Sequence, residues 1–261
     1  MSPSIGEIRV ERDGAVAIVT LDQPARMNAF TMAIREQLWQ AFDQLAEDNE
    51  TRAIILTGAG GHFCTGADTG DMGSQSSAAF LRRMRWLHRM IRAIAAIRKP
   101  VIAAVDGNCI GAGWSLALAC DIVIASSRAR FALSFGRIGY VPDAGAIWQL
   151  SRLVGVMRAK EIVYSGRMLG AEEAQRLGLL LDLAEPDALM TTAMERARSL
   201  AAGPSIALGM AKRQFDAAHA LSLDQFLELE FTMQPLMATT RDHQEGIAAM
   251  REKRVPHFSG E

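Results

Sequence analysis

The segment that most constrains the fold is an apolar run that ends in a glycine-rich loop. Residues 52–58 read Arg-Ala-Ile-Ile-Leu-Thr-Gly, and glycine recurs at positions 60, 61 and 66 before Asp68. A short β-branched run bounded by glycine predicts a buried strand. Glycine also lets the following backbone turn sharply, so that N–H groups of the loop face outward.

A second strand end shows the same arrangement. Residues 100–105 predict another strand, and Gly111-Ala112-Gly113 leads from it into a predicted helix over Trp114–Cys120. Backbone N–H groups brought together from two strand ends are suited to hold an anionic oxygen. The pair therefore suggests an enzyme that forms an enolate. The alternative for the first loop is an ordinary strand-to-helix turn in which Asp68 caps the next helix.

Strands and helices alternate through the first part of the chain. Predicted strands cover Glu7–Arg12, Val16–Leu21, Ala53–Thr57, Val101–Val105 and Asp121–Ala125, and predicted helices include Thr31–Glu47 and Ala78–Ile97. Strands joined by helices predict an α/β fold with a mostly parallel sheet. Beyond Gly145 the pattern is mainly helical. We therefore expect an α/β core over residues 1–200 and a helical region over residues 201–261.

Composition excludes several classes of function. The net charge is −1 and the isoelectric point is near 6.5, so we expect no nucleic-acid partner. The cysteines Cys64, Cys109 and Cys120 form no CxxC pair, and we expect reduced thiols in a cytoplasmic protein. No histidine cluster has the spacing of a metal site. No apolar run reaches the length of a membrane span, so we expect no metal and no membrane contact.

Asp143 is the carboxylate that the sequence singles out. It lies in Val-Pro-Asp-Ala-Gly, before a predicted helix that begins at Ala144. One interpretation is a helix cap. The other is a general acid/base, because the apolar neighbours Phe135, Tyr140 and Trp148 would raise its pKa. Both interpretations remain open at this stage.

Two other patterns favour structural explanations. The Gly111-Ala112-Gly113 turn resembles a dinucleotide-binding loop, but Leu116 stands where the third glycine is required. The predicted helix over residues 81–92 carries five arginines and a histidine opposite an apolar stripe of Leu81, Met84, Leu87 and Ile91. We interpret the arginines as a solvated face, with a phosphate-rich ligand or RNA as the alternative.

With these residues in view, the chain resembles the crotonase superfamily, also called the enoyl-CoA hydratase/isomerase family. Five motifs occur in the family's order, and together they span almost the whole chain. They are residues 24–29 (PARMNA), 63–68 (FCTGAD), 111–121 (GAGWSLALACD), 138–145 (IGYVPDAG) and 245–254 (EGIAAMREKR). In site pattern, the chain is most similar to the isomerases that act on ring-type phenylacetyl-CoA derivatives.

The resemblance implies a crotonase-like ββα spiral core with a C-terminal helical trimerisation region, assembled as a homotrimer or a dimer of trimers. It implies an acyl-CoA substrate, whose CoA moiety is part of the substrate, and no separate cofactor. The oxyanion donors carried over are the N–H groups of Ala67 and Ala112. The positions carried over for substrate or CoA binding are Ala25, Arg26, Thr65, Asp68, Thr69 and Lys253, and Trp114 is expected in the core or the pocket wall.

The departures from the family pattern concern the acid/base residues. The two glutamates that hydratases of this family use are replaced by Ser115 and Phe135, whereas Asp143 occupies the position of the functional aspartate in the ring-type isomerases. We therefore predict a double-bond or ring-type isomerase that uses one carboxylate. The alternatives are an enoyl-CoA hydratase and, from another class, a CoA- or RNA-binding protein with little catalysis.

Overall fold

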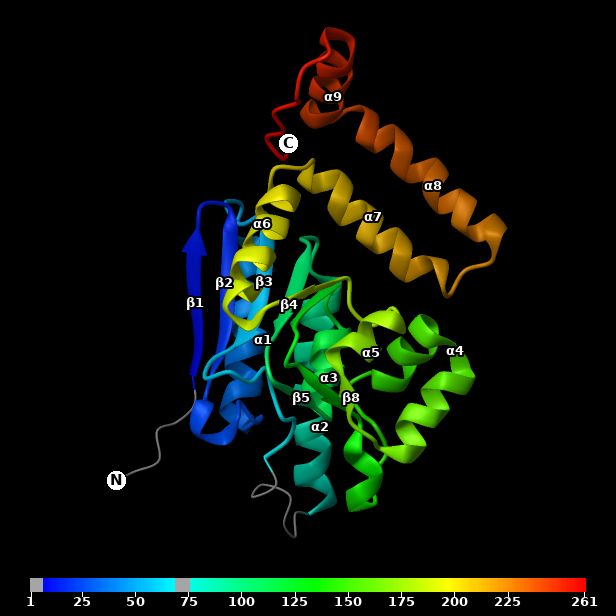
Figure 1. Ribbon diagram of the computed structural model, residues 1–261. Helices are drawn as coiled ribbons and strands as arrows, with labels where there is room; N and C mark the ends of the chain where they lie inside the picture. Colours follow the sequence, from blue (N-terminus) through cyan, green and yellow to red (C-terminus); the bar gives the residue numbers. More distant parts are fainter. Residues whose placement is uncertain (1–6, 69–75) are drawn as a thin grey trace.

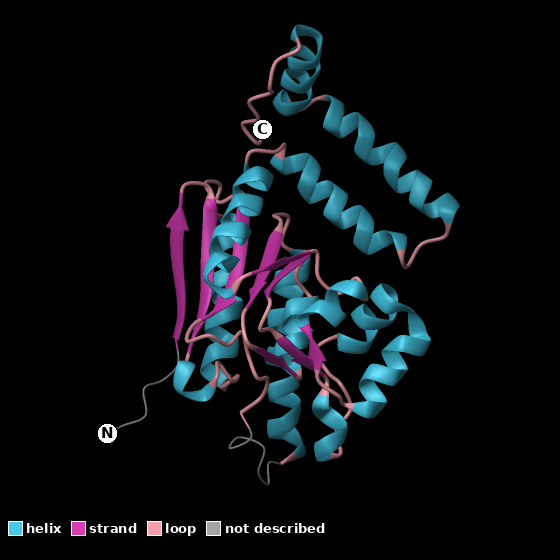
Figure 2. Ribbon diagram, viewed as in Figure 1, coloured by secondary structure: helices cyan, strands magenta, loops and turns pink. Residues whose placement is uncertain are grey.

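The computed structural model describes residues 7–68 and 76–261, and a six-stranded sheet forms its centre (Figures 1 and 2). The strands follow the order β1 (Glu7–Asp13), β2 (Val16–Asp22), β3 (Ala53–Gly58), β4 (Val101–Val105), β6 (Ile122–Ser126) and β9 (Asp182–Ala184). Only β1 runs antiparallel to its neighbour, across a hairpin, and the other pairings are parallel. The predicted mostly parallel sheet is confirmed.

A second, three-stranded sheet was not predicted. It pairs β5 (Asn108–Ile110) with β7 (Arg130–Ala132), and β7 with β8 (Leu169–Gly170). Each strand is two or three residues long, which is too short to show an alternating pattern in the sequence. This small sheet directs the chain from β4 towards α3.

The described helices cover the large sheet and continue beyond it. They are α1 (Met32–Glu47), α2 (Ser77–Ala96), α3 (Ala112–Leu118), α4 (Ala146–Ser165), α5 (Ala171–Arg176), α6 (Leu189–Ala201), α7 (Ser205–Ala218), α8 (Leu223–Ala238) and α9 (Arg241–Glu252). Short 3-10 turns are η1 (Pro24–Arg26), η3 (Ser134–Ile138) and η4 (Pro186–Ala188). Thr31 caps α1 as predicted, because its Oγ1 accepts from the Ile34 N–H at 3.2 Å.

Alternation along β3 builds a core on each face of the sheet. Ile54 and Leu56 join a large apolar cluster with α1, α2 and α3, whereas Ala53 and Ile55 join a smaller one beneath α6. All four side chains are fully buried. A parallel strand that is covered on both faces reads as a continuous apolar run, which explains why the β3 signal is so clear in the sequence.

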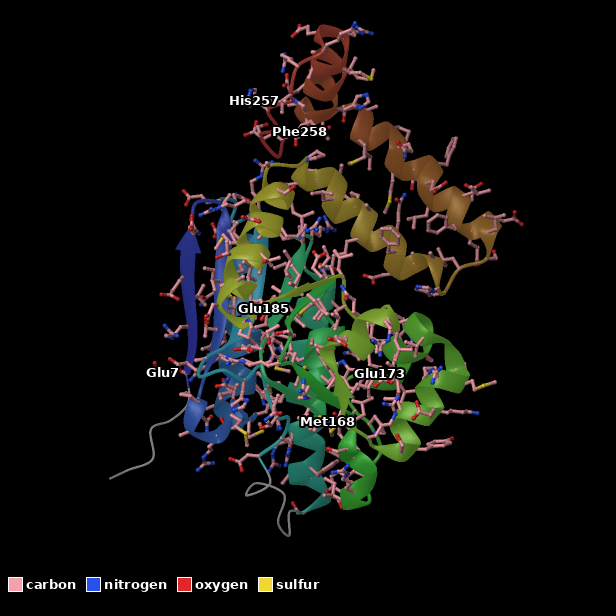
Figure 3. All side chains as sticks on the ribbon, viewed as in Figure 1. Glu7, Met168, Glu173, Glu185, His257 and Phe258 are labelled. Atoms are coloured by element: carbon pink, nitrogen blue, oxygen red, sulfur yellow. The ribbon has the colours of Figure 1, made fainter. Side chains whose placement is uncertain are left out.

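The C-terminal helices extend away from this core. α7 and α8 form an antiparallel hairpin, α9 follows it, and the tail returns towards the start of α7, with His257 and Phe258 on the returning segment (Figures 1 and 3). Arg52 anchors this tail, because its guanidinium donates to Ser205 Oγ at 2.7 Å and to the Phe258 carbonyl at 2.9 Å. The predicted boundary near residue 200 falls between α6 and α7. Within the described residues, no helix is long and apolar enough to cross a membrane.

Candidate active site

Asn28 shapes the loop that follows β3. Its buried side chain donates from Nδ2 to the carbonyls of Ala59 (2.9 Å) and His62 (2.7 Å), and Oδ1 accepts from the Gln23 N–H. A buried amide with these partners fixes two ends of a glycine-rich turn at once. Sequence reasoning included Asn28 only as a letter in a motif. A buried polar residue beside a glycine-rich loop was the signal that could have revealed this role.

The loops after β3 and β4 are joined by backbone hydrogen bonds. The Cys64 N–H donates to the Asn108 carbonyl at 3.0 Å, and the Ile110 N–H donates to the Cys64 carbonyl at 2.9 Å. Gly113 permits the closest approach, because a Cβ there would lie 2.2 Å from the Cys64 carbonyl oxygen. The β5 segment therefore holds the two glycine-rich loops against each other.

This contact brings Ala67 and Ala112 to the same cavity. A Cβ on Gly66 would lie 3.0 Å from the Ala112 nitrogen, so the two loops touch beside both alanines. Ala112 is the first residue of α3, where an N–H has no acceptor within the helix. Within the described part of the chain, neither the Ala67 nor the Ala112 N–H donates a hydrogen bond. Both groups are therefore available to a ligand oxygen.

Asp143 lines the same cavity and does not cap a helix. Helix α4 begins at Ala146, two residues later than predicted, with Gly145 as its N-cap and no side-chain cap. Positive φ angles at Ala144 (54°) and Gly145 (82°) turn the chain between Asp143 and the helix. The cap interpretation is therefore wrong. The asymmetry of its environment is clear, since Asp143 Oδ1 is buried and has no hydrogen-bond partner among the described residues.

The surroundings of Asp143 favour its protonated form. Burial raises the pKa of the Asp143 carboxyl above its usual value, and the positive charges of Arg35, Arg83 and His88 act in the opposite direction. Arg35 and Arg83 line the cavity and are themselves buried, with exposed fractions of 2% and 8%. Neither was predicted there. Arg83 was placed on a solvated face, but the buried stripe of α2 consists of Arg83, Leu87, Met90 and Ile94.

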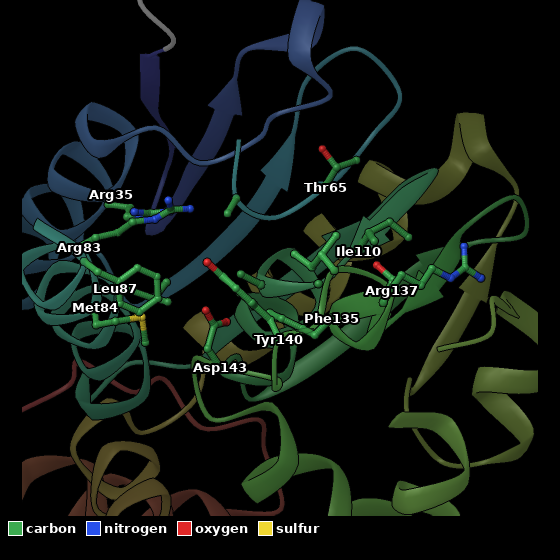
Figure 4. A pocket seen from close by; sticks show the side chains of 16 residues that line it. Arg35, Thr65, Arg83, Met84, Leu87, Ile110, Phe135, Arg137, Tyr140 and Asp143 are labelled. Carbon is green, nitrogen blue, oxygen red and sulfur yellow. The ribbon is translucent and has the colours of Figure 1, made fainter. Parts of the chain in front are cut away.

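The remaining lining is largely apolar, and the cavity volume is about 270 Å³. Figure 4 shows the cavity between side chains of α2 on one side and Thr65, Ile110 and Phe135 on the other. Tyr140 closes part of the rim, with its ring edge-to-face against Phe80 at 6.2 Å between centroids. The arrangement combines two backbone donors, one carboxyl group and an apolar chamber.

The two positions without a glutamate differ in their location. Phe135 lines the cavity, whereas Ser115 is fully buried in α3 and its Oγ donates to the Gly111 carbonyl at 3.3 Å. Neither side chain has a carboxyl group that could activate a water. Among the described residues that line the cavity, Asp143 is the one carboxylic acid.

Comparison with known proteins decides the family. The family model described as "Enoyl-CoA hydratase/isomerase" matches residues 11–261. The chain belongs to the enoyl-CoA hydratase/isomerase family. The resemblance drawn from the five motifs is confirmed, and so is the crotonase-like α/β fold.

Similar family members carry different reaction names. The chain is 36% identical to the "1,2-epoxyphenylacetyl-CoA isomerase" of Escherichia coli, covering 94% of this chain and 95% of that protein. It is 41% identical to a "Probable enoyl-CoA hydratase" of Rhodobacter capsulatus, covering 97% and 98%. The crystal structure of an enoyl-CoA hydratase from Bacillus anthracis superposes with a TM-score of 0.93 at 32% identity, covering 97% and 99%. The family is therefore clear, while these names include both isomerases and hydratases.

Several residues that the family resemblance assigned to CoA binding lie together. Arg26, beside Ala25 in η1, forms an ion pair with Asp68, and Thr65 donates to the Met27 carbonyl at 3.3 Å. This pairing also removes the alternative role of Asp68, because α2 is capped by Ser76. Ala25 and Arg26 are exposed beside the loop that carries Ala67. The cluster forms one face on the loop that leads to the cavity.

Three other assigned residues lie elsewhere. Trp114 is buried in the core against Phe131, with ring centroids 5.6 Å apart, and it does not line the cavity. Lys253 is exposed at the end of α9, on the C-terminal extension and apart from the cavity (Figure 1). Thr69 lies outside the described residues. The chain by itself therefore brings neither Trp114 nor Lys253 to the site.

The thiols and metal ligands of the described chain suggest no further chemistry at this site. Cys64, Cys109 and Cys120 are free and buried, as predicted, and burial raises the pKa of the Cys64 thiol to about 12. They are structural residues rather than nucleophiles. Over residues 7–68 and 76–261, no group of three side chains has the makings of a metal site.

Proposed function

We propose that this family member is an acyl-CoA isomerase in which Asp143 moves a proton along the acyl group. Asp143 as carboxylate removes a proton from the α or γ carbon of an enoyl thioester, and the electron pair passes to the thioester oxygen. The N–H groups of Ala67 and Ala112 stabilise that enolate oxygen. Asp143 then returns the proton to the other carbon, so the double bond moves and no atom is gained or lost.

One observation carries this proposal. The two unpaired backbone donors and a single carboxyl group with a raised pKa line one apolar cavity. A 1,3-proton shift needs one group that accepts and then donates the same proton, and a pKa raised towards neutrality suits both steps. Water addition would need a second acid/base residue to hold and activate the water. Phe135 stands at one such position and excludes water from that part of the wall.

The second candidate is an enoyl-CoA hydratase, which the name of the Rhodobacter capsulatus relative supports. This reaction would pair Asp143 with another acid that reaches the cavity. The acid closest in sequence to the cavity loop is Asp71, which lies outside the described residues. Isomerase and hydratase therefore differ in a testable way, by whether water enters the product.

The experiment is incubation of trans-2-enoyl-CoA and 3-enoyl-CoA thioesters with the protein in D₂O, followed by mass spectrometry. We expect interconversion with deuterium uptake and no gain of water. Asp143→Asn should lower the rate by about 10²–10⁴-fold, the usual contribution of general acid–base catalysis. A product heavier by one water would show a hydratase. No turnover of aliphatic or ring-type thioesters by the parent protein would contradict both enzyme proposals and favour a binding protein.

We further propose a homotrimer, or a dimer of trimers, with no separate cofactor. α7 and α8 project from the core and expose apolar side chains that a second copy of the chain would cover. In such an assembly, Lys253 of one copy would reach the CoA phosphates held by a neighbour. Ala25, Arg26, Thr65, Asp68 and Thr69 are proposed as the CoA contacts of the same chain.

A further inference from the structure

The outer face of α2 carries arginines that have no ion-pair partner. Arg82, Arg85, Arg89 and Arg92 recur at intervals of three and four residues, which places them on one face of the helix. All four are exposed, and within the described chain none makes a salt bridge. Helix α2 contains no aspartate or glutamate that could neutralise them. Most other arginines of the described chain, by contrast, pair with a carboxylate or a carbonyl.

Two tryptophans hold one of these arginines in place. The Arg89 Cζ lies 3.5 Å from the centre of the Trp39 ring and 5.3 Å from that of Trp86. The two indoles themselves are 5.7 Å apart and tilted by 60°. A guanidinium stacked on an indole is fixed by cation–π attraction, and it presents its other face outward. Arg89 is therefore ordered, unlike a freely solvated side chain.

These groups line a groove between α1 and α2 with a volume of about 690 Å³. Its lining comprises Trp39, Asp43, Arg85, His88, Arg89, Arg92 and Ala93. Asp43 is the one acid among them. The groove shares no lining residue with the cavity that holds Asp143, which α2 meets through Arg83, Met84 and Leu87. The two sites are therefore on different faces of the same helix.

We propose that this groove binds single-stranded nucleic acid. Arg85 and Arg92, one turn to either side of Arg89, would contact successive phosphates, and a base would stack on the exposed face of the Arg89 guanidinium. Cationic grooves with stacking surfaces bind single strands in this way, and bases stack on arginine planes as well as on aromatic rings. The net charge of −1 does not oppose this, because charges beyond about 10 Å are screened at 0.1 M salt.

The test is fluorescence anisotropy of labelled 15-nucleotide oligouridylate and oligothymidylate, titrated with the full chain between 50 and 200 mM KCl. The variant Arg85→Gln/Arg89→Gln/Arg92→Gln should bind at least tenfold more weakly than the parent. Its slope of log K against log salt should fall by about 2, at about 0.7 per lost phosphate contact. The control Arg158→Gln/Arg176→Gln/Arg251→Gln removes the same charge from exposed sites elsewhere and should keep the parent affinity.

A conservative variant separates stacking from charge. Arg89→Lys keeps the positive charge but loses the plane on Trp39, so it should weaken binding several-fold and reduce the quenching of tryptophan fluorescence by the oligonucleotide. Equal melting temperatures of parent and variants establish that each protein is folded. The proposal is overturned if the parent does not bind either oligonucleotide at 50 mM KCl, or if both triple variants weaken binding equally. Binding to vesicles of phosphatidylcholine and phosphatidylserine without binding to oligonucleotides also overturns it, in favour of a membrane surface.

Discussion

At the scale of single residues, Asp143 links function to stability. Because burial raises its pKa, the folded protein holds this proton more tightly than the unfolded chain does. Stability from this group is therefore complete at low pH and is lost as pH rises from 3.8 through the folded-state pKa. Asp143→Asn removes the buried charge, so at pH 7 it should be more stable than the parent. The gain in melting temperature should be about 2–4 °C for each kcal/mol.

Urea unfolding at pH 7 and pH 3.5 checks this prediction. The difference between Asp143→Asn and the parent should be present at pH 7 and vanish at pH 3.5, where both side chains are neutral. Asp187→Asn, at an exposed position, is the matched control and should show no such pH-dependent gain. A variant that is less stable than the parent at pH 7 would show that Arg35 and Arg83 stabilise the carboxylate more than burial penalises it.

Residues of the site differ in how far sequence could predict them. The positions of Ala67 and Ala112 followed from glycines beside strand ends, because such backbone needs are visible in single letters. Asn28, Arg35 and Arg83 could not be placed in the same way. Their burial depends on which side of a loop or helix meets the cavity, and that is set by packing between segments far apart in the chain. Asp143 was found as a residue, but its cap role was wrong because two left-handed residues delay the helix.

At the scale of elements, contact between α3 and the loop after β3 positions the backbone donors. Gly113→Ala gains about 1 kcal/mol of helix propensity. However, the new Cβ would lie 2.2 Å from the Cys64 carbonyl, and such overpacking costs about 1–3 kcal/mol or more when the neighbour is backbone. We expect net destabilisation, and a loss of turnover larger than the loss of folded protein because the Ala112 N–H moves.

Thermal unfolding and steady-state kinetics of Gly113→Ala check this expectation. Gly136→Ala serves as the control, because a Cβ there meets no atom within 4 Å. That variant should keep the melting temperature of the parent. If Gly113→Ala were as stable and as active as the parent, close approach of the two loops would not be a requirement of the site.

Elements also mark the limit of sequence-based prediction of the fold. β3 and β4 were predicted because strands buried on both faces read as unbroken apolar runs. The strands of the second sheet were missed, since each has only two or three residues and gains its identity from its partners. The face of α2 was also misjudged, because Leu81 is 57% exposed while Arg83 is buried. Amphipathic patterns locate a helix more reliably than they orient it.

At the scale of the whole molecule, the C-terminal hairpin presents more apolar surface than a single chain can bury. Leu223, Phe215 and Phe231 on α7 and α8 are 71–76% exposed, and Leu227 and Leu236 are about half exposed. Large apolar patches of this kind mark association surfaces. We therefore expect the parent to elute as three chains of 28.3 kDa, or as six, in size-exclusion chromatography with light scattering. Leu227→Glu/Phe231→Glu should shift the mass to one chain, whereas the control Val10→Glu, on the exposed face of β1, should leave the assembly intact. A monomeric parent would rule out the trimer, and with it a CoA contact from the Lys253 of a neighbouring copy.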